Sequence, residues 1–174
     1  MPVIVRRARE EDSRTIAEYA LKLFAQHREY DPERFASFGN LEGAAWFYGG
    51  QANSNDAAVL VAEIDSKVVG FAYMQFEKIN YPALLENAMW LHDIYVDEAA
   101  RGTGAGKALL EASANVAKEF GAEKVILSVA ARNRYAHEFF ERNGYRPTMV
   151  EMTLNLGNAE SLNVEAREID DLSF

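Results

Sequence analysis

The sequence of 174 residues contains no cysteine. This absence excludes disulfide bonds, thiolate nucleophiles and zinc sites built on cysteine, and we expect no metal site. Long apolar runs are absent too. None approaches the ~20 residues that span a bilayer, and the start, Met-Pro-Val-Ile-Val-Arg-Arg, lacks the apolar centre of a signal peptide. We therefore expect a cytoplasmic protein without a membrane partner.

Basic residues are scarce. The chain has 18 Lys and Arg against 27 Asp and Glu, a formal net charge of −9 at pH 7. Nucleic-acid binding needs Lys and Arg against phosphates, so this balance argues against a nucleic-acid partner. Hydrophobic residues make up 49% of the chain, which argues against disorder and, at this length, predicts one folded domain with its own core.

The end of the chain differs in composition from the rest. After Gly157 it carries five acidic residues and one basic residue, and its apolar residues are sparse. We expect a domain over residues 1–156 and an acidic C-terminal tail over residues 157–174. Two interpretations of the tail stay open: a solvated appendage, or a strand or helix that docks on a partner subunit.

Hydrophobic periodicity predicts a mixture of helices and strands, which places the chain in the α/β class in the broad sense, or α+β. Helices are expected over 12–30, 41–48, 105–120 and 133–142, and a polar loop over 51–56. Strands are expected over 3–5, 57–64, 68–76, 89–96, 124–129 and 149–156, with a loop over 80–87. In the strand over 89–96, Trp90 and His92 should lie on the face opposite to Leu91 and Asp93.

A glycine-rich loop, Arg101-Gly-Thr-Gly-Ala-Gly-Lys107, connects a buried strand to an amphipathic helix. Glycine lets the backbone approach a ligand closely, and a helix start offers unpaired N–H groups and the positive end of the helix dipole. The loop therefore predicts a site for a phosphate-bearing ligand, and a connector that only lets strand and helix pack is the alternative. The spacing of its glycines differs from the GxxxxGK[ST] pattern of a P-loop. A dinucleotide-binding fold has its glycine loop after the first strand, and several predicted strands precede this loop, which argues against such a fold.

Arg101-x-x-Gly104-x-Gly106 resembles the Q/R-x-x-G-x-G/A signature of the GNAT superfamily of N-acetyltransferases, which bind acetyl-CoA. Residues 133–145 are similar to the N-x-x-A-x-x-F-Y-x-x-x-G-F block of the same family. The resemblance covers residues 3–156, most closely 89–147, and leaves the tail outside. It implies a GNAT-like fold, with a mixed central sheet of about six to seven strands flanked by about four helices. It also implies an acyltransferase that uses acetyl-CoA as co-substrate.

The resemblance further implies a cofactor-binding set. Backbone N–H groups of the glycine loop would hold the pyrophosphate of CoA, and the backbone of the preceding strand would pair with the pantetheine arm. Asn133 would bind near the thiol end, although Asn is equally suited to capping a helix. The set is Ile94, Tyr95, Val96, Arg101, Gly102, Thr103, Gly104, Ala105, Gly106, Lys107, Asn133, Ala136 and Phe140.

Acetyl transfer needs a neutral amine, but an alkylamine resembling Lys has a pKa of ~10.4 and is mostly protonated at pH 7. In relatives that act on diamines, the strand before the loop carries a Glu that serves as the base. Here His92 takes that place, with Asp93 as a lesser candidate or an orienting group. An imidazole, with an ordinary pKa of ~6.5, suits base work at neutral pH. A structural histidine satisfied by a neighbour is the alternative.

The general acid departs from the family pattern. The usual Tyr, which protonates the departing thiolate, corresponds to Phe140, and Phe has no proton to give. A thiol with a pKa near ~8.5 is a fair leaving group and could take its proton from water. Tyr135, one helical turn earlier, and Tyr81 are the other candidates.

The acceptor in this family lies between the first two helices and the strand that carries His92. Carboxylates and aromatics in that region suit a cationic amine by charge and by cation–π contact, while ordinary turn chemistry is the alternative. We expect direct transfer, in a ternary complex, to the primary amine of a small molecule. A protein or peptide N-acetyltransferase and a non-catalytic CoA-binding sensor are the alternatives, and the resemblance implies a homodimer. The candidate substrate-binding residues are His27, Tyr30, Asp31 and Trp46.

Overall fold

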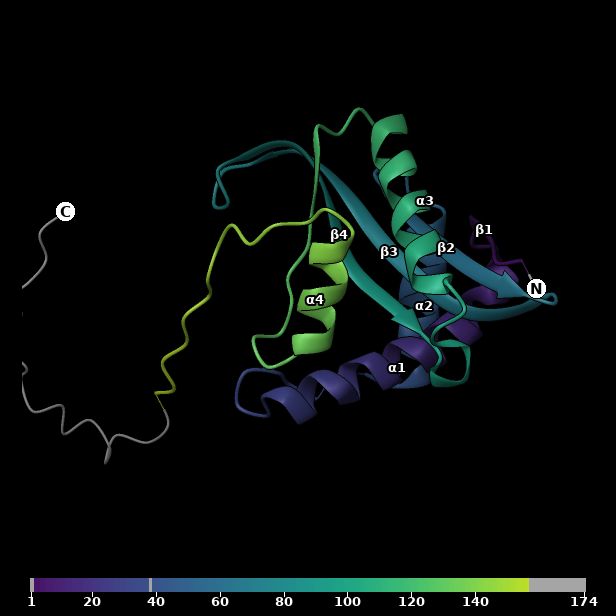
Figure 1. The fold of residues 1–174 in the computed structure, drawn as a ribbon, viewed down its shortest axis with the longest axis horizontal. Coiled ribbons are helices and arrows are strands. Elements are labelled where there is room, and N and C mark those ends of the chain that lie inside the picture. Colours follow the sequence, from purple (N-terminus) through teal and green to yellow (C-terminus); the bar gives the residue numbers. More distant parts are fainter. Residues whose placement is uncertain (1, 38, 157–174) are drawn as a thin grey trace, which may run out of the picture.

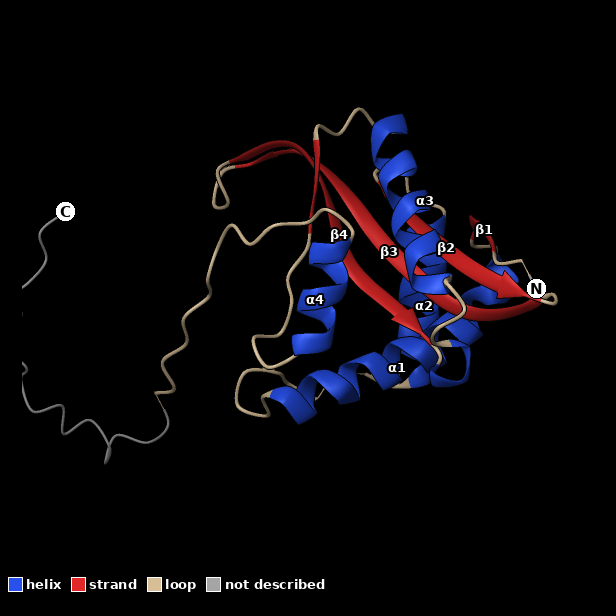
Figure 2. Ribbon diagram, in the orientation of Figure 1, coloured by secondary structure: helices blue, strands red, loops and turns tan. Residues whose placement is uncertain are grey.

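The computed structural model describes residues 2–37 and 39–156, so the predicted tail of residues 157–174 lies outside the described residues. One sheet forms the centre, with its strands in the order β1-β2-β3-β4-β5 (Figures 1 and 2). All neighbouring strands are antiparallel except β4 and β5, which are parallel. This mixed sheet confirms the predicted class. The strands are β1 (Ile4–Arg7), β2 (Ala57–Ile64), β3 (Lys67–Asn80), β4 (Leu85–Val96) and β5 (Lys124–Ile126).

Helices cover both faces of the sheet. α1 (Ser13–Tyr30) and α2 (Leu41–Ala52) pack on one face, and α3 (Ala105–Glu119) packs on the other, with Phe140 of α4 (Arg134–Arg142) in the same core. β2 has an uninterrupted apolar sequence because its two faces are both covered: Val59 and Val61 face α1, and Ala58 and Leu60 face α3. Two short 3₁₀ turns, η1 (Glu10–Asp12) and η2 (Glu98–Ala100), precede α1 and α3. Within the described residues, no helix is both long and apolar enough to cross a bilayer.

The sheet has five strands among the described residues, slightly fewer than the about six to seven expected from the family resemblance. The strand predicted over residues 149–156 is wrong: no residue from 145 to 156 belongs to a strand. Residues 147–156 instead form an extended arm, which leaves the body beyond α4 (Figure 1). Alternation in a sequence indicates which two faces a strand would present, but a strand also needs a neighbour for its backbone hydrogen bonds.

Several predicted boundaries are also wrong. α2 continues through Gly49-Gly50 to Ala52, past its predicted end at residue 48, and the side chain of Asn53 donates a hydrogen bond to the Gly49 carbonyl (3.0 Å). The loop predicted over 80–87 shrinks to residues 81–84, because β3 and β4 form a long hairpin. β5 ends at Ile126 instead of 129. Packing against neighbouring elements overrides local propensity in these places.

A β-bulge interrupts the alternation of β4. Tyr73 pairs with Asp93 and Met74 pairs with Leu91, so His92 has no opposite residue on β3. The regular alternation predicted over 89–96 is therefore wrong at this point, since a bulge inserts one extra residue and turns the strand. Bulges of this kind re-aim side chains, and this one presents His92 to solvent.

An ion network ties the N-terminal strand to the turn before α1. The guanidinium of Arg6 donates hydrogen bonds to both carboxylate oxygens of Asp12 (2.7 and 3.0 Å) and to Glu63 (2.6 Å). Asp12 is only 5% exposed. Burial acts to raise the pKa of Asp12, but the hydrogen bonds from Arg6 and from the backbone N–H of Arg9 outweigh it, so the pKa lies below its ordinary value.

Candidate functional site

A cavity of about 350 Å³ opens where β4 and β5 separate. The two strands pair only from Ala88 to Trp90 on the β4 side, and beyond Trp90 no strand among the described residues pairs with the edge of β4 that faces β5. Ile94, Tyr95 and Val96 from this open edge line the cavity. The volume lies within the range of small-molecule sites, which run from about 300 to 1,000 Å³.

The glycine loop forms one end of this cavity. Gly102 and Gly104 have φ angles of +81° and +91°, a left-handed conformation that side chains with a Cβ rarely adopt. Gly104 is the N-cap of α3, so the unpaired N–H groups of the first helical turn lie next to the cavity. Of the predicted loop residues, only Thr103 is missing from the lining, and its hydroxyl donates a hydrogen bond to the Ala100 carbonyl (2.7 Å).

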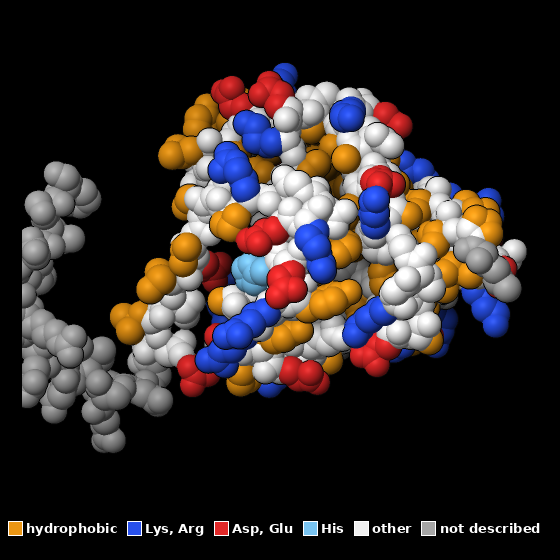
Figure 3. Space-filling view, in the orientation of Figure 1, with side chains coloured by type: hydrophobic (Ala, Val, Ile, Leu, Met, Phe, Trp, Pro, Cys, Tyr) orange, Lys and Arg blue, Asp and Glu red, His pale blue; other side chains and the backbone are white. Residues whose placement is uncertain are grey.

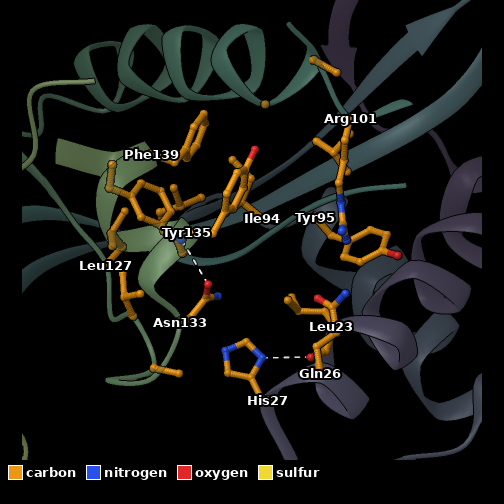
Figure 4. A pocket seen from close by; sticks show the side chains of 18 of the residues that line it. Leu23, Gln26, His27, Ile94, Tyr95, Arg101, Leu127, Asn133, Tyr135 and Phe139 are labelled. Atoms are coloured by element: carbon orange, nitrogen blue, oxygen red, sulfur yellow. Dashed lines mark hydrogen bonds between the residues drawn. The ribbon is translucent and has the colours of Figure 1, made fainter. Parts of the chain in front are cut away.

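α4 forms a second wall. Asn133 is the N-cap of this helix, and its side-chain oxygen accepts a hydrogen bond from the Ala136 N–H (3.1 Å). Phe140 is 8% exposed and belongs to the core, while Tyr135 is 66% exposed and still reaches the lining. Figure 4 shows Asn133 and Phe139 approaching the cavity from α4, opposite to Leu23 and His27 on α1.

α1 forms the opposite wall, with His27 and Tyr30 in the lining. The Nδ1 of His27 lies 2.9 Å from the Leu23 carbonyl, and Arg132 donates a hydrogen bond to the Tyr30 carbonyl (2.9 Å). Two other predicted substrate residues are not brought together with these. Trp46 is 82% exposed, and the Asp31 carboxylate accepts hydrogen bonds from the N–H groups of residues 33 and 34, as expected of turn chemistry.

A second cavity, on the α2 side of the sheet, meets the first one at His92, which lines both. Its walls are largely aromatic: Tyr73 stacks on His92 with ring centroids 5.4 Å apart, and Phe47 and Tyr48 meet Tyr73 edge-on at 5.5 and 5.8 Å. Asp93 supplies the carboxylate of this cavity. The bulge in β4 lies at these residues: His92 is at the junction of the two cavities, and Asp93 lines the second one.

The charge of Asp93 is held in a buried setting. Burial raises the pKa of this carboxyl above its ordinary value, against the opposing effects of a hydrogen bond from the Tyr48 hydroxyl (2.8 Å) and of the nearby His92 and His27. Burial and the Asp93 charge likewise raise the pKa of Tyr48, and they raise the pKa of Tyr73 to about 12. The two tyrosines therefore stay protonated and act as hydrogen-bond donors at neutral pH.

Sequence reasoning missed most of the second cavity. The five missed residues named below all lie within α2 or on β3, and no spacing rule singles them out. Trp46 was predicted as one of the aromatics of this region, but its neighbours Phe47 and Tyr48 are the residues of α2 that line the second cavity. The unpredicted lining residues of the second cavity include Phe47, Tyr48, Gln51, Tyr73 and Gln75, and those of the first include Leu23, Gln26, Phe139 and residues 127–130.

No group of three or more His, Asp or Glu side chains within the described residues is arranged to hold a metal ion. In sequence, residues 16–145 match the Acetyltransferase (GNAT) family. A Bacillus subtilis protein named "Uncharacterized N-acetyltransferase YhfO" is 30% identical over 143 residues, which are 81% of this chain and 88% of that protein.

Solved structures share the fold. The tetramutant of the BH1408 protein from Bacillus halodurans superposes with a TM-score of 0.75 at 22% identity, over 88% of this chain and 99% of that one. The aminoglycoside N-acetyltransferase AAC(6')-Iy in complex with CoA superposes with a TM-score of 0.73 at 14% identity, over 88% of this chain and 94% of that one. At these identities the likeness concerns the fold alone.

Proposed function

This chain is an acetyltransferase of the GNAT family, and we propose that it transfers the acetyl group of acetyl-CoA directly to the primary amine of a small, positively charged molecule. The observation that carries the proposal is the meeting of two different cavities at one residue, His92. One cavity has the features of a phosphate-bearing cofactor site, and the other has the aromatic and acidic walls of a cation site.

The first cavity fits CoA on two independent grounds. Left-handed glycines at 102 and 104 leave space without a Cβ beside the N-terminus of α3, which suits a pyrophosphate. In the part of the chain that the structure describes, the edge of β4 that faces β5 has no strand partner at residues 94–96, so its backbone is available to an amide-bearing arm. Asn133 uses its side-chain oxygen as a cap, which leaves its amide N–H groups as donors toward the cavity. Acetyl-CoA supplies the activated acetyl thioester.

The second cavity suits an ammonium group. The faces of Tyr48, Tyr73 and Phe47 favour a cation by cation–π contact, and Asp93 adds an opposite charge in a partly desolvated place. A neutral acceptor would gain nothing from Asp93. Aminoglycosides and polyamines are cationic amines of the required chemistry, and we place them ahead of neutral amines.

His92 is the proposed general base. It lines both cavities, so it can reach an amine in the second cavity that attacks a thioester in the first. Its ring is sandwiched near Tyr73 and Trp90, at centroid distances of 5.4 and 6.1 Å, which fixes the plane in which the imidazole accepts a proton. Asp93 orients and attracts the substrate ammonium before the proton leaves.

The proposed proton donor to the departing thiolate is Tyr135 or a water molecule. Tyr81, at the tip of the β3–β4 hairpin, lines neither cavity, whereas Tyr135 lines the first one. Tyr135 is largely exposed, so a bound water can replace its hydroxyl, and we expect Tyr135→Phe to lower the rate only modestly.

The proposal is tested by incubating the protein and acetyl-CoA with polyamines, aminoglycosides, amino acids and N-terminal peptides, and by following release of the free thiol. We expect release with small cationic amines. Asp93→Asn should raise KM for acceptors with two or more amines more than for a monoamine, because only the former keep a charge near Asp93 after the reacting amine has lost its proton. Release with peptides alone would point to a protein N-acetyltransferase. Thermal stabilisation by CoA without release would point to a sensor.

A further inference from the structure

The nitrogen of an ammonium acceptor loses two protons during acetyl transfer, and His92 accounts for only one of them. The first proton leaves R–NH3⁺ before attack. The nitrogen lone pair then forms the N–C bond, the carbonyl electron pair moves to oxygen, and the nitrogen becomes positive again. It must lose a second proton as the C=O bond re-forms and the C–S bond breaks, while His92 still holds the first.

We propose that His27 is the second proton acceptor of the reaction, and that its Nε2 takes the proton released as the tetrahedral intermediate collapses, directly or through one water. The electron pair of the C–S bond passes to sulfur, which takes a proton from Tyr135 or water. His92 and His27 return their protons to solvent, so the products are one amide, one CoA thiol and, overall, one released proton. This assignment rests on the proposed function, because it concerns the same reaction.

Few side chains of the first cavity can accept this proton. His27 and His92 are its two imidazoles, and no carboxylate is among the described residues that line it. The third histidine of the chain, His137 on α4, lines neither cavity. The other titratable side chains of the lining are of types that carry their proton at neutral pH, namely Tyr30, Tyr95, Arg101, Lys107 and Tyr135.

The hydrogen bonding of His27 leaves one ring nitrogen available as a base. Nδ1 lies 2.9 Å from the carbonyl oxygen of Leu23. A carbonyl oxygen only accepts, so Nδ1 carries a hydrogen whether the ring is neutral or charged. In the neutral ring the lone pair is therefore on Nε2, which has no hydrogen-bond partner among the described residues.

The ring lies at the wall of the cofactor cavity, opposite the residue proposed to bind near the thioester. His27 is half-buried, and Phe35 meets its ring edge-on at a centroid distance of 4.9 Å. Figure 4 shows the bond from His27 directed back to its own helix, and the rest of the ring lying toward Asn133 across the cavity. Arg132 donates a hydrogen bond to the Tyr30 carbonyl (2.9 Å), which joins the α1 wall to the segment that carries Asn133. Nε2 therefore faces the space in which the N–C bond forms.

Charges of both signs lie around His27. Asp93 is near enough for the charge of His27 to act on it: burial raises the pKa of that carboxyl, and His92 and His27 act to lower it. On the face shown in Figure 3, Lys and Arg side chains over α1 and α4 lie among Asp and Glu side chains. Imidazole changes its charge between pH 5 and 8, so it can take a proton and release it again at neutral pH. The charged and titratable groups on the elements around the ring are His92 and Asp93 on β4, Asp31 and Arg34 after α1, Arg132 before α4, and Arg28, Glu29 and Tyr30 on α1.

The test replaces His27 by Asn, because a side-chain amide can still donate a hydrogen bond to the Leu23 carbonyl but offers no basic nitrogen. With a diamine acceptor we expect kcat of His27→Asn to fall at least about tenfold, while KM for acetyl-CoA and for the amine changes less than about twofold. His137→Asn is the matched control and should keep the wild-type rate. Free imidazole in the buffer should restore a large part of the rate of His27→Ala, where it can occupy the vacated space, and should leave His137→Ala unchanged.

A change of acceptor separates the two histidines. When fluorine atoms beside the reacting amine make it neutral at the assay pH, the first proton is already gone but the second must still leave. The loss of rate in His92→Ala should therefore shrink with the fluorinated acceptor, and the loss in His27→Asn should persist.

The outcomes distinguish the role of His27 from the reaction itself. A normal kcat in His27→Asn, whatever its KM, would overturn the role of His27 alone. An absence of imidazole rescue in His27→Ala, or losses that shrink alike in the His92 and His27 variants, would overturn that role as well. A wild type that releases no thiol with any amine would overturn the proposed acetyl transfer, and this assignment with it.

Discussion

Removal of one hydroxyl, in Tyr48→Phe, probes the buried charge at the acceptor cavity. Tyr48 is 2% exposed, and its ring packs edge-on against Phe71 and Tyr73, at centroid distances of 5.4 and 5.8 Å. Phe keeps this packing and loses only the 2.8 Å hydrogen bond that the hydroxyl donates to Asp93. The substitution therefore isolates one interaction with a half-buried carboxylate.

The expected loss of stability depends on the charge of the oxygen that accepts the hydrogen bond. A hydrogen bond to an ionised group contributes about 1.5–3 kcal/mol, against about 0.5–1.5 kcal/mol for a neutral pair. For a chain of this size each kcal/mol corresponds to about 2–4 °C in Tm, so we expect Tm to fall by about 3–12 °C at pH values well above the pKa of Asp93.

The pH dependence has a definite sign. The hydrogen bond from Tyr48 acts to lower the pKa of Asp93, against the burial that raises it. The bond therefore stabilises the ionised form, and its contribution is present at high pH and declines as the pH falls through the folded pKa of Asp93. Because burial leaves that pKa above its ordinary value, the decline begins at a higher pH than for an exposed Asp.

Thermal melts of wild type and variant, followed by circular dichroism from acidic to neutral pH, measure this difference. Tyr73→Phe is the matched control, since the Tyr73 hydroxyl lies 3.3 and 3.2 Å from the neutral side chains of Gln51 and Gln75. The fall in Tm for Tyr73→Phe should be smaller than for Tyr48→Phe and nearly independent of pH in the acidic range. Equal losses for the two variants, or a Tyr48→Phe loss that does not change with pH, would refute an ionised Asp93 at neutral pH.

Three further variants test other parts of the structure. Gly104→Val should weaken CoA binding at least tenfold, or by about 1.4 kcal/mol, as measured by calorimetry. Gly121→Val is the control, because Gly121 has a similar left-handed φ of +79° at the far end of α3. This control should destabilise the fold and leave the affinity for CoA unchanged. His92→Ala should lower the acetylation rate mostly at lower pH, while His137→Ala should not, and an unchanged pH–rate profile would count against His92 as base. Arg6→Met should cost about 1–3 kcal/mol in urea unfolding at neutral pH and less in acid, as the carboxylate it holds becomes protonated; a loss independent of pH would contradict this.

Most residues predicted for the cofactor side of the site line one cavity, because their positions depend on local features. A few neighbouring residues are enough to predict the glycine turns at 102 and 104, the helix start at residue 105 and the Asn cap at 133. The four helices followed from periodicity, and the mixed sheet followed from the family resemblance.

The acceptor side could not be predicted in the same way. Tyr48 and Tyr73 come together only through the packing of α2 on β3, and their spacing in sequence carries no trace of this contact. The bulge that brings out His92 depends on the register between β3 and β4, which a one-residue shift changes and which periodicity alone does not fix. Residues 149–156 show a related failure, since their alternation indicated a strand, but no described strand lies beside them to pair with.

Direct transfer between two cavities that meet at His92 is the central claim, and intact mass measures it most directly. The protein is mixed with acetyl-CoA carrying an isotopically labelled acetyl group and with its best amine acceptor, and the masses of protein and amine are followed together with thiol release. We predict that the label appears on the amine in step with the thiol and that the mass of the protein never changes. A labelled protein that accumulates before the labelled amine, or thiol release without labelled amine, would contradict it.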